Sequence, residues 1–265
     1  MADILSRIVA TKETEIAAAQ SRRSLADLKA IAADRSDYRP FTESLRATHE
    51  TGTGIIAEIK RASPSKGDIR VDLNPEQYAR SYEQGGATAI SVLTDSSYFK
   101  GSPEDLKAAR AVAGLPVLRK DFLISDYQLY ESAVMGADAV LLIVRILTHA
   151  ALSELIGLSR DLNLDALVEI HDEQDLETAS AAGAELIGIN NRDLKTFKTD
   201  IQVAKRLVAA FSPGQIPVAA SGIAGPGDIQ QTRQAGINNF LIGESLVRAK
   251  DTPAFLKTLI QGTET

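Results

Sequence analysis

Short runs of hydrophobic residues recur along most of the chain, separated by longer stretches in which apolar residues follow helical spacing. Eight such runs, rich in β-branched residues or leucine, span 55–60, 89–94, 117–121, 139–144, 166–170, 186–190, 218–221 and 240–243. Buried strands that alternate with helices form parallel sheets. Eight repeats of this unit therefore predict an α/β protein, a (β/α)8 TIM barrel, rather than an open sheet.

Residues at the ends of the intervening segments support helices there. Asn74-Pro75, Ser102-Pro103 and the weaker Gly225-Pro226 are typical of an N-cap followed by proline in the first helical turn. Glycines lie where these helices would have to end before the next strand, at Gly85-Gly86, Gly136, Gly183 and Gly236.

The first fifty residues do not follow this alternation. Ile4, Ile8 and Ile16 indicate an amphipathic helix whose polar face carries Lys12, Glu13 and Glu15. Two shorter helices are expected at 25–31 and at 41–45. We therefore predict an N-terminal helical extension, 1–50, packed on a catalytic barrel, 51–265, as one structural domain. An arm for oligomer contacts is the alternative for this extension.

The first strand carries an acid and a base on one face. Side chains along a strand alternate between faces. Ile55, Ala57 and Ile59 suit the face packed against helices, which leaves Glu58 and Lys60 pointing into the barrel.

The same argument assigns inward residues to later strands. They are Leu118, Lys120 and Phe122; Leu167 and Glu169; Gly188, Asn190 and Arg192; and Ala219 and Ser221, with Val218 and Ala220 outward. Catalytic groups of such barrels gather at the carboxyl ends of the strands. Arg119 and Asp121 fall on the other face of the third strand, where we expect them to pair with neighbouring helices or strands.

The inward charged residues do not balance. Lys60, Lys120 and Arg192 face only Glu58 and Glu169, so one positive charge is left over, which predicts an anionic ligand. The loop after the first strand adds the donors Arg61, Ser63, Ser65 and Lys66, which suit an anion.

Two glycine turns indicate a phosphate site. Gly222 and Gly243 follow the seventh and eighth predicted strands, whose loops often hold phosphate in these barrels. Glu244 would contribute its backbone N–H while its carboxylate turns away.

Composition narrows the class of protein. The 265 residues are 44% hydrophobic, with net charge −6 and no cysteine, which excludes disulfides, cysteine-ligated metals and a cysteine nucleophile. We expect no nucleic-acid or membrane partner, no signal peptide, a cytoplasmic location, and a monomer or weak homo-oligomer. The three histidines show no paired spacing for a metal and are interpreted as surface or loop residues.

Seven motifs in one order resemble the indole-3-glycerol-phosphate synthase family. They are Ala57–Gly67, Ser91–Asp95, Arg119–Phe122, Val168–His171, Ile187–Leu194, Ser221–Ile223 and Ile242–Ser245. The first and fifth are long and specific, whereas the glycine turns are not.

The resemblance implies a lyase of tryptophan biosynthesis that closes an indole ring with loss of carbon dioxide and water, without metal or cofactor. By position, Lys120 corresponds to the general acid and Glu169 to the acid/base group, with Glu58 assisting a lysine and Lys60 holding an anionic group. The resemblance further implies that substrate is held by a larger set: Asn190, Arg192, Ser63, Phe99 and Ser221, with Gly222, Gly243 and Glu244 around the phosphate.

Chemistry favours the same roles independently of the resemblance. A general acid works best with a pKa close to the working pH, and we expect Lys60 and Arg192 to lower that of Lys120. The rival hypotheses are a sugar-phosphate isomerase and a non-catalytic binder of phosphorylated metabolites on the same scaffold.

Overall fold

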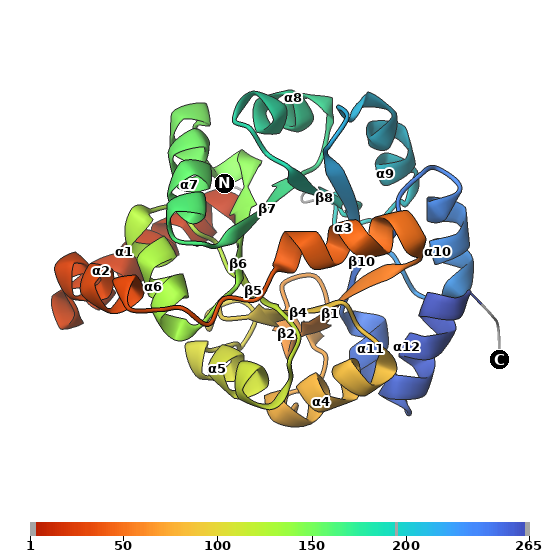
Figure 1. The fold of residues 1–265 in the computed structure, drawn as a ribbon, viewed down its shortest axis with the longest axis horizontal. Helices are drawn as coiled ribbons and strands as arrows, with labels where there is room; N and C mark the ends of the chain where they lie inside the picture. The colour runs from red at the N-terminus through yellow and green to blue at the C-terminus, as the bar shows by residue number, and fades with distance from the viewer. Residues whose placement is uncertain (1–3, 194–195, 263–265) are drawn as a thin grey trace.

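Eight parallel strands close into a barrel in the computed structural model, which describes residues 4–193 and 196–262 (Figure 1). The barrel strands are β1 (Gly54–Ile59), β4 (Ala89–Leu93), β5 (Val117–Lys120), β6 (Ala139–Ile143), β7 (Asp165–Ile170), β8 (Leu186–Asn190), β9 (Ile216–Ala220) and β10 (Asn239–Ile242). Because β1 pairs with both β4 and β10, the sheet has no free edge. Each predicted run contains one of these strands, so the predicted (β/α)8 barrel is confirmed.

Helices surround the barrel in the expected alternation. They are α4 (Pro75–Gly85), α5 (Pro103–Val112), α6 (Asp126–Met135), α7 (His149–Asp161), α8 (Glu173–Ala181), α9 (Gln202–Leu207), α10 (Pro226–Arg233), α11 (Glu244–Arg248) and α12 (Thr252–Gln261), with 3-10 turns η1 (Val144–Ile146) and η2 (Val208–Ala210). Asn74 and Ser102 accept hydrogen bonds from the first turns of α4 and α5, as their N-cap assignment predicts. The loop after β1 folds into a small hairpin of β2 (Ala62–Ser63) and β3 (Gly67–Asp68).

Residues inside the barrel and residues under the helices form two separate cores. Ile55, Ala57 and Ile59 lie in the outer core, as predicted, and Ile56 lies in the inner one. Leu118, Phe122 and Leu167 also belong to the inner core, so the predicted faces of the first, third and fifth strands are confirmed.

The predicted faces of β9 were wrong. Val218 and Ala220 belong to the inner core, whereas Ala219 packs in the outer one. Both faces of this strand are apolar, so its sequence could not separate them. Its pairing decides: Val218 lies beside inward Gly188, and Ala219 beside outward Phe240.

Three helices precede the barrel: α1 (Ile4–Arg22), α2 (Leu25–Ala33) and α3 (Phe41–Thr51). Helix α3 is longer than predicted and crosses the amino-terminal end of the barrel, in front of the strands in Figure 1. Its Phe41 and Leu45 are fully buried in the inner core, so α3 closes this end. Helix α2 packs against α6 on the outside.

Buried charges tie the segment after α2 to the same end of the barrel. Arg35 Nη2 lies 3.0 Å from Asp138 Oδ1, and Arg110 Nη1 pairs with the other Asp138 oxygen. Arg39 donates to two backbone carbonyls between α5 and β5, at 2.7 Å each. The expected packing of the extension on the barrel therefore involves both ion pairs and apolar contacts, while the domain division at residue 50 stays a prediction.

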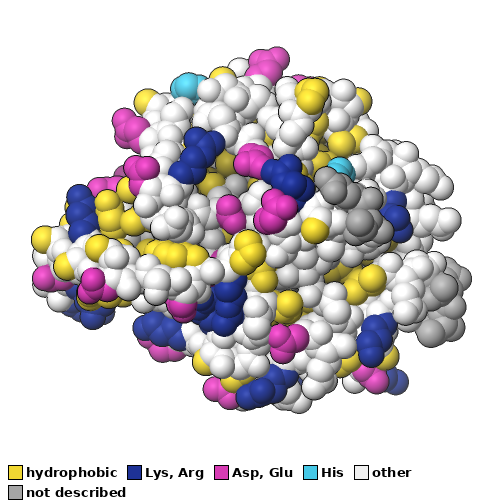
Figure 2. Space-filling view, viewed as in Figure 1, with side chains coloured by type: hydrophobic (Ala, Val, Ile, Leu, Met, Phe, Trp, Pro, Cys, Tyr) yellow, Lys and Arg dark blue, Asp and Glu magenta, His cyan; other side chains and the backbone are white. Residues whose placement is uncertain are grey.

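The surface carries no single dominant charge on the side that faces the viewer. In Figure 2 basic and acidic side chains lie interspersed around the elements of Figure 1, in keeping with the net charge of −6. None of the helices in the described ranges has the length and apolarity needed to cross a membrane.

Candidate active site

All twelve residues predicted from the sequence to contact substrate line one cavity of about 670 Å³ at the carboxyl end of the barrel. They come from the ends of β1, β5, β7, β8, β9 and β10 and from the loops that follow, and Phe99 comes from the loop after β4. The cavity also takes in Ser65 and Lys66 of the β2–β3 hairpin. Leu194, the last residue of the fifth motif, lies outside the described residues.

Glu58 holds both cavity lysines. It is 2% exposed, its Oε1 pairs with Lys60 Nζ, and its Oε2 lies 3.6 Å from Lys120 Nζ. Burial alone would raise the pKa of the Glu58 carboxyl, but the two ammonium groups outweigh burial and hold it below its ordinary value. Glu58 is therefore a carboxylate that aligns two cations across the cavity.

The expected lowering of the Lys120 pKa was wrong. Burial disfavours the ammonium, but the Glu58 and Glu169 carboxylates outweigh burial and raise the pKa of Lys120, with Arg192 opposing them. The sequence shows both the acidic and the basic residues of the cavity, but only the fold decides which of them lie closest to the Lys120 ammonium. In the free site, Lys120 is consequently a fully charged donor.

Glu169 and Asn190 form a second polar group in the cavity. Asn190 Nδ2 donates to Glu169 Oε1 at 3.1 Å, and Asn190 Oδ1 accepts from the Arg192 backbone N–H at 3.0 Å. The Arg192 guanidinium in turn donates to Ser65 Oγ at 3.2 Å, which links the β8 loop to the hairpin after β1. The end of β7, the β8 loop and the hairpin after β1 are thus joined by hydrogen bonds at the rim.

The loop after β9 approaches its neighbours closely. Ser221 and Gly222 have φ values of +66° and +83°, a conformation that favours glycine. A Cβ at Gly222 would lie 2.6 Å from Thr199 Cγ2, so that position has no room for a side chain. Buried Asn191 donates to Ser221 O at 3.0 Å and holds this loop against β8. Asn191 stands in the same motif as Asn190, but the sequence did not predict a role for it.

The absence of a side chain at Gly243 also leaves room for Glu58 of β1. The φ of Gly243 is −124°, but a Cβ there would overlap Glu58 Oε1. A glycine is therefore required so that Glu58 can reach the lysines, besides any role in approaching phosphate. Glu244 and Arg248 both line the cavity, and the Glu244 carboxylate pairs there with Arg248 Nε at 3.2 Å, along α11.

Apolar side chains form the other wall of the cavity. Phe99 packs 6.1 Å from Phe122 between ring centroids, and Ile4, Leu5 and Ile8 of α1 add to this surface. The three α1 residues were predicted only as the apolar face of a helix. No local signal in the sequence connects them with the barrel rim.

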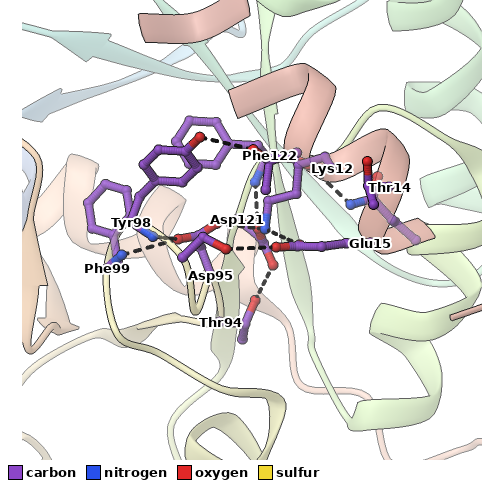
Figure 3. A network of polar contacts seen from close by, with 12 residues as sticks. Lys12, Thr14, Glu15, Thr94, Asp95, Tyr98, Phe99, Asp121 and Phe122 are labelled. Carbon is purple, nitrogen blue, oxygen red and sulfur yellow. Dashed lines mark hydrogen bonds and ion pairs between the residues drawn. The ribbon is translucent and has the colours of Figure 1, made fainter. Parts of the chain in front are cut away.

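A buried ammonium fastens α1 to that rim (Figure 3). Lys12 is 2% exposed, and its Nζ lies 2.6 Å from Asp95 Oδ2, 2.9 Å from Asp121 Oδ1 and 2.8 Å from Glu15 Oε2. Placing Lys12 on the polar face of α1 was therefore wrong. It follows Ile4 and Ile8 at intervals of four residues, so it lies in the same stripe.

The two aspartates also organise the residues beside the cavity. Asp95 Oδ1 accepts the backbone N–H groups of Tyr98 and Phe99, at 2.6 and 3.1 Å. Asp121 Oδ2 accepts from Thr94 Oγ1 at 2.6 Å at the end of β4, and Arg119 pairs with Glu131 of α6 at 2.8 Å, so both have partners on neighbouring elements, as expected. This cluster thus sets the position of Phe99 and of the strand end that carries Lys120.

Two further expectations were wrong. Arg61 turns away from the cavity, because its guanidinium is held by Asp105, with Nη2 to Oδ1 at 3.0 Å. His171 is not a surface residue: it is 8% exposed, and its Nε2 lies 3.7 Å from Glu169 Oε1. Its position directly after a buried strand was the available signal. Across the described ranges, no group of three or more potential ligands among His, Cys, Asp and Glu is arranged to hold a metal.

Comparison with known proteins points to one family. A family model described as indole-3-glycerol phosphate synthase matches residues 5–259. The protein of that name from Desulfosudis oleivorans is 67% identical over 261 residues, which cover 98% of this chain and 99% of that one. The one from Syntrophobacter fumaroxidans is 48% identical over 261 residues, with 98% of each covered. A thiamine phosphate pyrophosphorylase from Pyrococcus furiosus shares the fold alone, with a TM-score of 0.59 at 15% identity over 80% of this chain and 95% of that one.

Proposed function

The chain belongs to the indole-3-glycerol phosphate synthase family, and on that premise we propose which residues carry each step of the reaction. The enzyme converts 1-(2-carboxyphenylamino)-1-deoxyribulose 5-phosphate into indole-3-glycerol phosphate, with loss of carbon dioxide and water. An aromatic carbon attacks the ribulose carbonyl, decarboxylation restores the aromatic ring, and dehydration completes the indole. The reaction therefore needs an acid at the carbonyl oxygen and a group that exchanges a proton during dehydration.

Lys120 is the general acid of ring closure. Its ammonium is fully charged, lies 3.6 Å from Glu58 Oε2 and lines the cavity. This placement is the observation that carries the proposal, because a buried and oriented ammonium can protonate a carbonyl oxygen as the new bond forms. Glu58 orients Lys120 and Lys60, and Lys60 holds the carboxylate or the phosphate of the substrate.

Glu169 exchanges the proton in dehydration. It lines the same cavity as the lysines and is oriented by Asn190, whose amide donates to it at 3.1 Å. Arg192 and Ser63 position the sugar chain, and Phe99 packs against the aromatic ring of the substrate. These roles leave the apolar wall for the ring and the polar wall for the reacting atoms.

The phosphate is held at the loops after β9 and β10. Ser221, Gly222, Gly243 and the backbone of Glu244 surround the space there, and all four line the cavity. Backbone N–H groups with no side chain in the way suit a phosphate dianion. The phosphate end would thus be fixed while the ring end reacts.

The activity is tested by mixing the purified protein with the carboxyphenylamino-ribulose phosphate and following indole absorbance. We expect turnover with release of one carbon dioxide for each indole. Binding of the substrate without turnover would instead favour the non-catalytic binder, and isomerised sugar phosphate without indole would favour the isomerase.

We further propose a cytoplasmic enzyme without a nucleic-acid or membrane partner that is a monomer or a weak homo-oligomer. All twelve site residues line a cavity within this one chain, which is compatible with an active monomer. Light scattering across a concentration series, measured beside specific activity, tests this: activity that rises with assembly would contradict it.

A further inference from the structure

Arg248 is a cation of the cavity to which the reaction above gives no role. It is the last residue of α11, and it lines the cavity together with Gly243 and Glu244. Leu246 and Val247, the two residues before it, are buried and do not line the cavity. Long side chains on a helix point toward its amino end, so the Arg248 side chain extends back along α11 toward Gly243.

The backbone of α11 holds this side chain at a defined place. Ser245 Oγ donates to Ile223 O at 3.2 Å, which joins the helix to the loop after β9. Val247 O accepts from the buried Tyr78 Oη at 3.0 Å, which joins the helix to α4. Arg248 is therefore carried by a helix that is fixed against one of the two loops around the proposed phosphate position.

Only one edge of the Arg248 guanidinium is used in the free site. Its Nε lies 3.2 Å from Glu244 Oε1, one turn earlier. Nη1 and Nη2 form no hydrogen bond or ion pair with any residue that the structure describes. A guanidinium carries five N–H donors in a planar fork, which binds phosphate oxygens in pairs. The outer edge of Arg248 is thus available to a phosphate while Glu244 keeps Nε.

The proposed phosphate position needs a cation of its own. Within the described ranges, Glu244 is the only other charged residue that the loops after β9 and β10 bring to the cavity, and its carboxylate would repel a phosphate. Lys60 and Lys120 are already paired with Glu58. Arg248 therefore supplies the positive charge of these loops, and it also neutralises Glu244.

Substrate can reach this pair from the cavity. The Arg248 and Glu244 side chains are 53% and 33% exposed. A phosphate monoester carries about −1.5 to −2 charges near pH 7, so it attracts the guanidinium more strongly than a single carboxylate does. A phosphate on Nη1 and Nη2 would complete the bonding of a guanidinium that is half used in the free site.

We propose that Arg248 is a specificity-determining residue that binds the phosphate of the substrate through Nη1 and Nη2, while Glu244 orients it through Nε. The inference rests on the proposed phosphate position at the loops after β9 and β10. Arg248 then selects phosphorylated ligands over the same molecules without phosphate.

The indole ring of the product allows binding to be measured without turnover. The chain contains no tryptophan, so an indole ligand can be excited beyond the tyrosine absorption band without emission from the protein. Wild type and Arg248→Met are titrated with indole-3-glycerol phosphate and with its dephosphorylated form, indole-3-glycerol, and the anisotropy of the indole emission is followed. We expect Arg248→Met to bind the phosphorylated ligand about tenfold more weakly and the dephosphorylated one unchanged.

Two outcomes overturn the proposal. A structural role of Arg248 would weaken both ligands alike, and no role at all would leave both affinities at the wild-type level. Arg233→Met is the matched control, because Arg233 is an exposed arginine in the last turn of α10 that does not line the cavity. We expect this control to bind both ligands as the wild type does.

A double variant tests the neutralising contact. Arg248→Met leaves the Glu244 carboxylate without its cation, so adding Glu244→Gln should recover roughly threefold of the lost affinity for the phosphorylated ligand. No recovery would overturn this part of the proposal.

The wild-type protein separates the possible failures. Equal affinity of the wild type for the two ligands would mean that the proposed phosphate position itself is wrong. A wild-type preference for the phosphorylated ligand that Arg248→Met fully retains would overturn only the inference about Arg248. In turnover, we expect Arg248→Met to raise KM about tenfold with kcat little changed, because the phosphate takes no part in the chemical steps.

Discussion

Glu58 is the residue on which both cavity lysines depend. Each of its two oxygens faces one ammonium, and burial keeps water from screening these pairs. An uncompensated ammonium at either site would be costly to bury, so the carboxylate keeps both lysines charged and oriented. The reactivity of Lys120 is therefore a property of the pair and not of the lysine alone.

Removing the Lys120 ammonium should abolish most turnover. Lys120→Met keeps the length of the side chain but cannot donate a proton, and we expect kcat to fall by about 10²-fold or more. Steady-state kinetics and circular dichroism check the loss and the fold. Because the Lys120 pKa is raised, this residue stays protonated below about pH 10, so a basic limb of the wild-type profile near neutral pH would have another origin. Unimpaired turnover in Lys120→Met would remove it from the mechanism.

A side chain at Gly243 should disturb chemistry as well as binding. The added Cβ of Gly243→Ala overlaps Glu58 Oε1, so Glu58 must move off the lysines. We expect kcat to fall and KM to rise together, each by roughly tenfold or more. Gly227→Ala is the control, because a Cβ there meets open space. A change in KM alone would mean that Gly243 acts only at the phosphate.

Helix α1 combines two functions in one stripe of residues. Ile4 and Ile8 line the cavity, and Lys12, one turn further, anchors the helix through Asp95 and Asp121. The anchor is buried on all sides, so its charges are not screened by solvent. The position of the apolar cavity wall therefore depends on this ion-pair cluster.

Breaking the anchor should loosen that wall. Lys12→Met leaves two buried carboxylates with fewer cations, which typically costs about 3 kcal/mol of unfolding free energy. We expect a higher KM from the displaced apolar wall and a lower urea midpoint. Glu13→Gln, an exposed neighbour on the same helix, serves as the control. If Lys12→Met matched the wild type in both KM and midpoint, the cluster would have no anchoring role.

Over the whole molecule, the N-terminal segment covers both ends of the barrel. Helix α3 fills the amino-terminal end with apolar side chains, and α1 fastens to the carboxyl-terminal rim through charge. Buried ion pairs occur at both ends of the barrel, at Asp121 on the carboxyl-terminal rim and at Asp138 on the amino-terminal end. Several of these groups have pKa values that differ from those of an unfolded chain.

These pKa shifts predict how stability depends on pH. The pKa values of Glu58, Asp121 and Asp175 are lowered, and that of Asp37 falls to about 2, because ion pairs with nearby cations outweigh burial or solvent. A carboxyl group whose pKa is lowered by folding stabilises the protein at pH values above its pKa in the unfolded chain. This stability is lost as the pH falls through its pKa in the folded protein. We therefore expect the unfolding free energy to drop between about pH 4 and pH 2.

The lysines act in the opposite direction. The pKa values of Lys12 and Lys120 are raised, so their contribution is complete below about pH 10.5 and is lost as pH rises beyond it. Urea titrations across both pH ranges check the two arms. An unfolding free energy that stays constant from pH 4 to pH 2 would contradict the prediction for the carboxyl groups. An unfolding free energy that stays constant above pH 11 would contradict the prediction for the lysines.

Local pattern was sufficient for the barrel and for the polar residues at its rim. Strand periodicity placed Glu58, Lys60 and Glu169 inward because the opposite face of each strand is apolar. Where both faces are apolar, as in β9, the same rule had nothing to distinguish and the assigned faces were wrong. Periodicity thus predicts a face only where the chemistry of the two faces differs.

The sequence by itself therefore determined the eightfold alternation, the caps of its helices and the set of acids and bases at the strand ends, since each depends on neighbours within a few residues. Only the tertiary structure decided which polar side chains meet: Lys12 with Asp95 and Asp121, and Glu58 with Lys120. Electrostatic energy depends on distance and burial, and residues far apart in the chain acquire both only when the barrel closes.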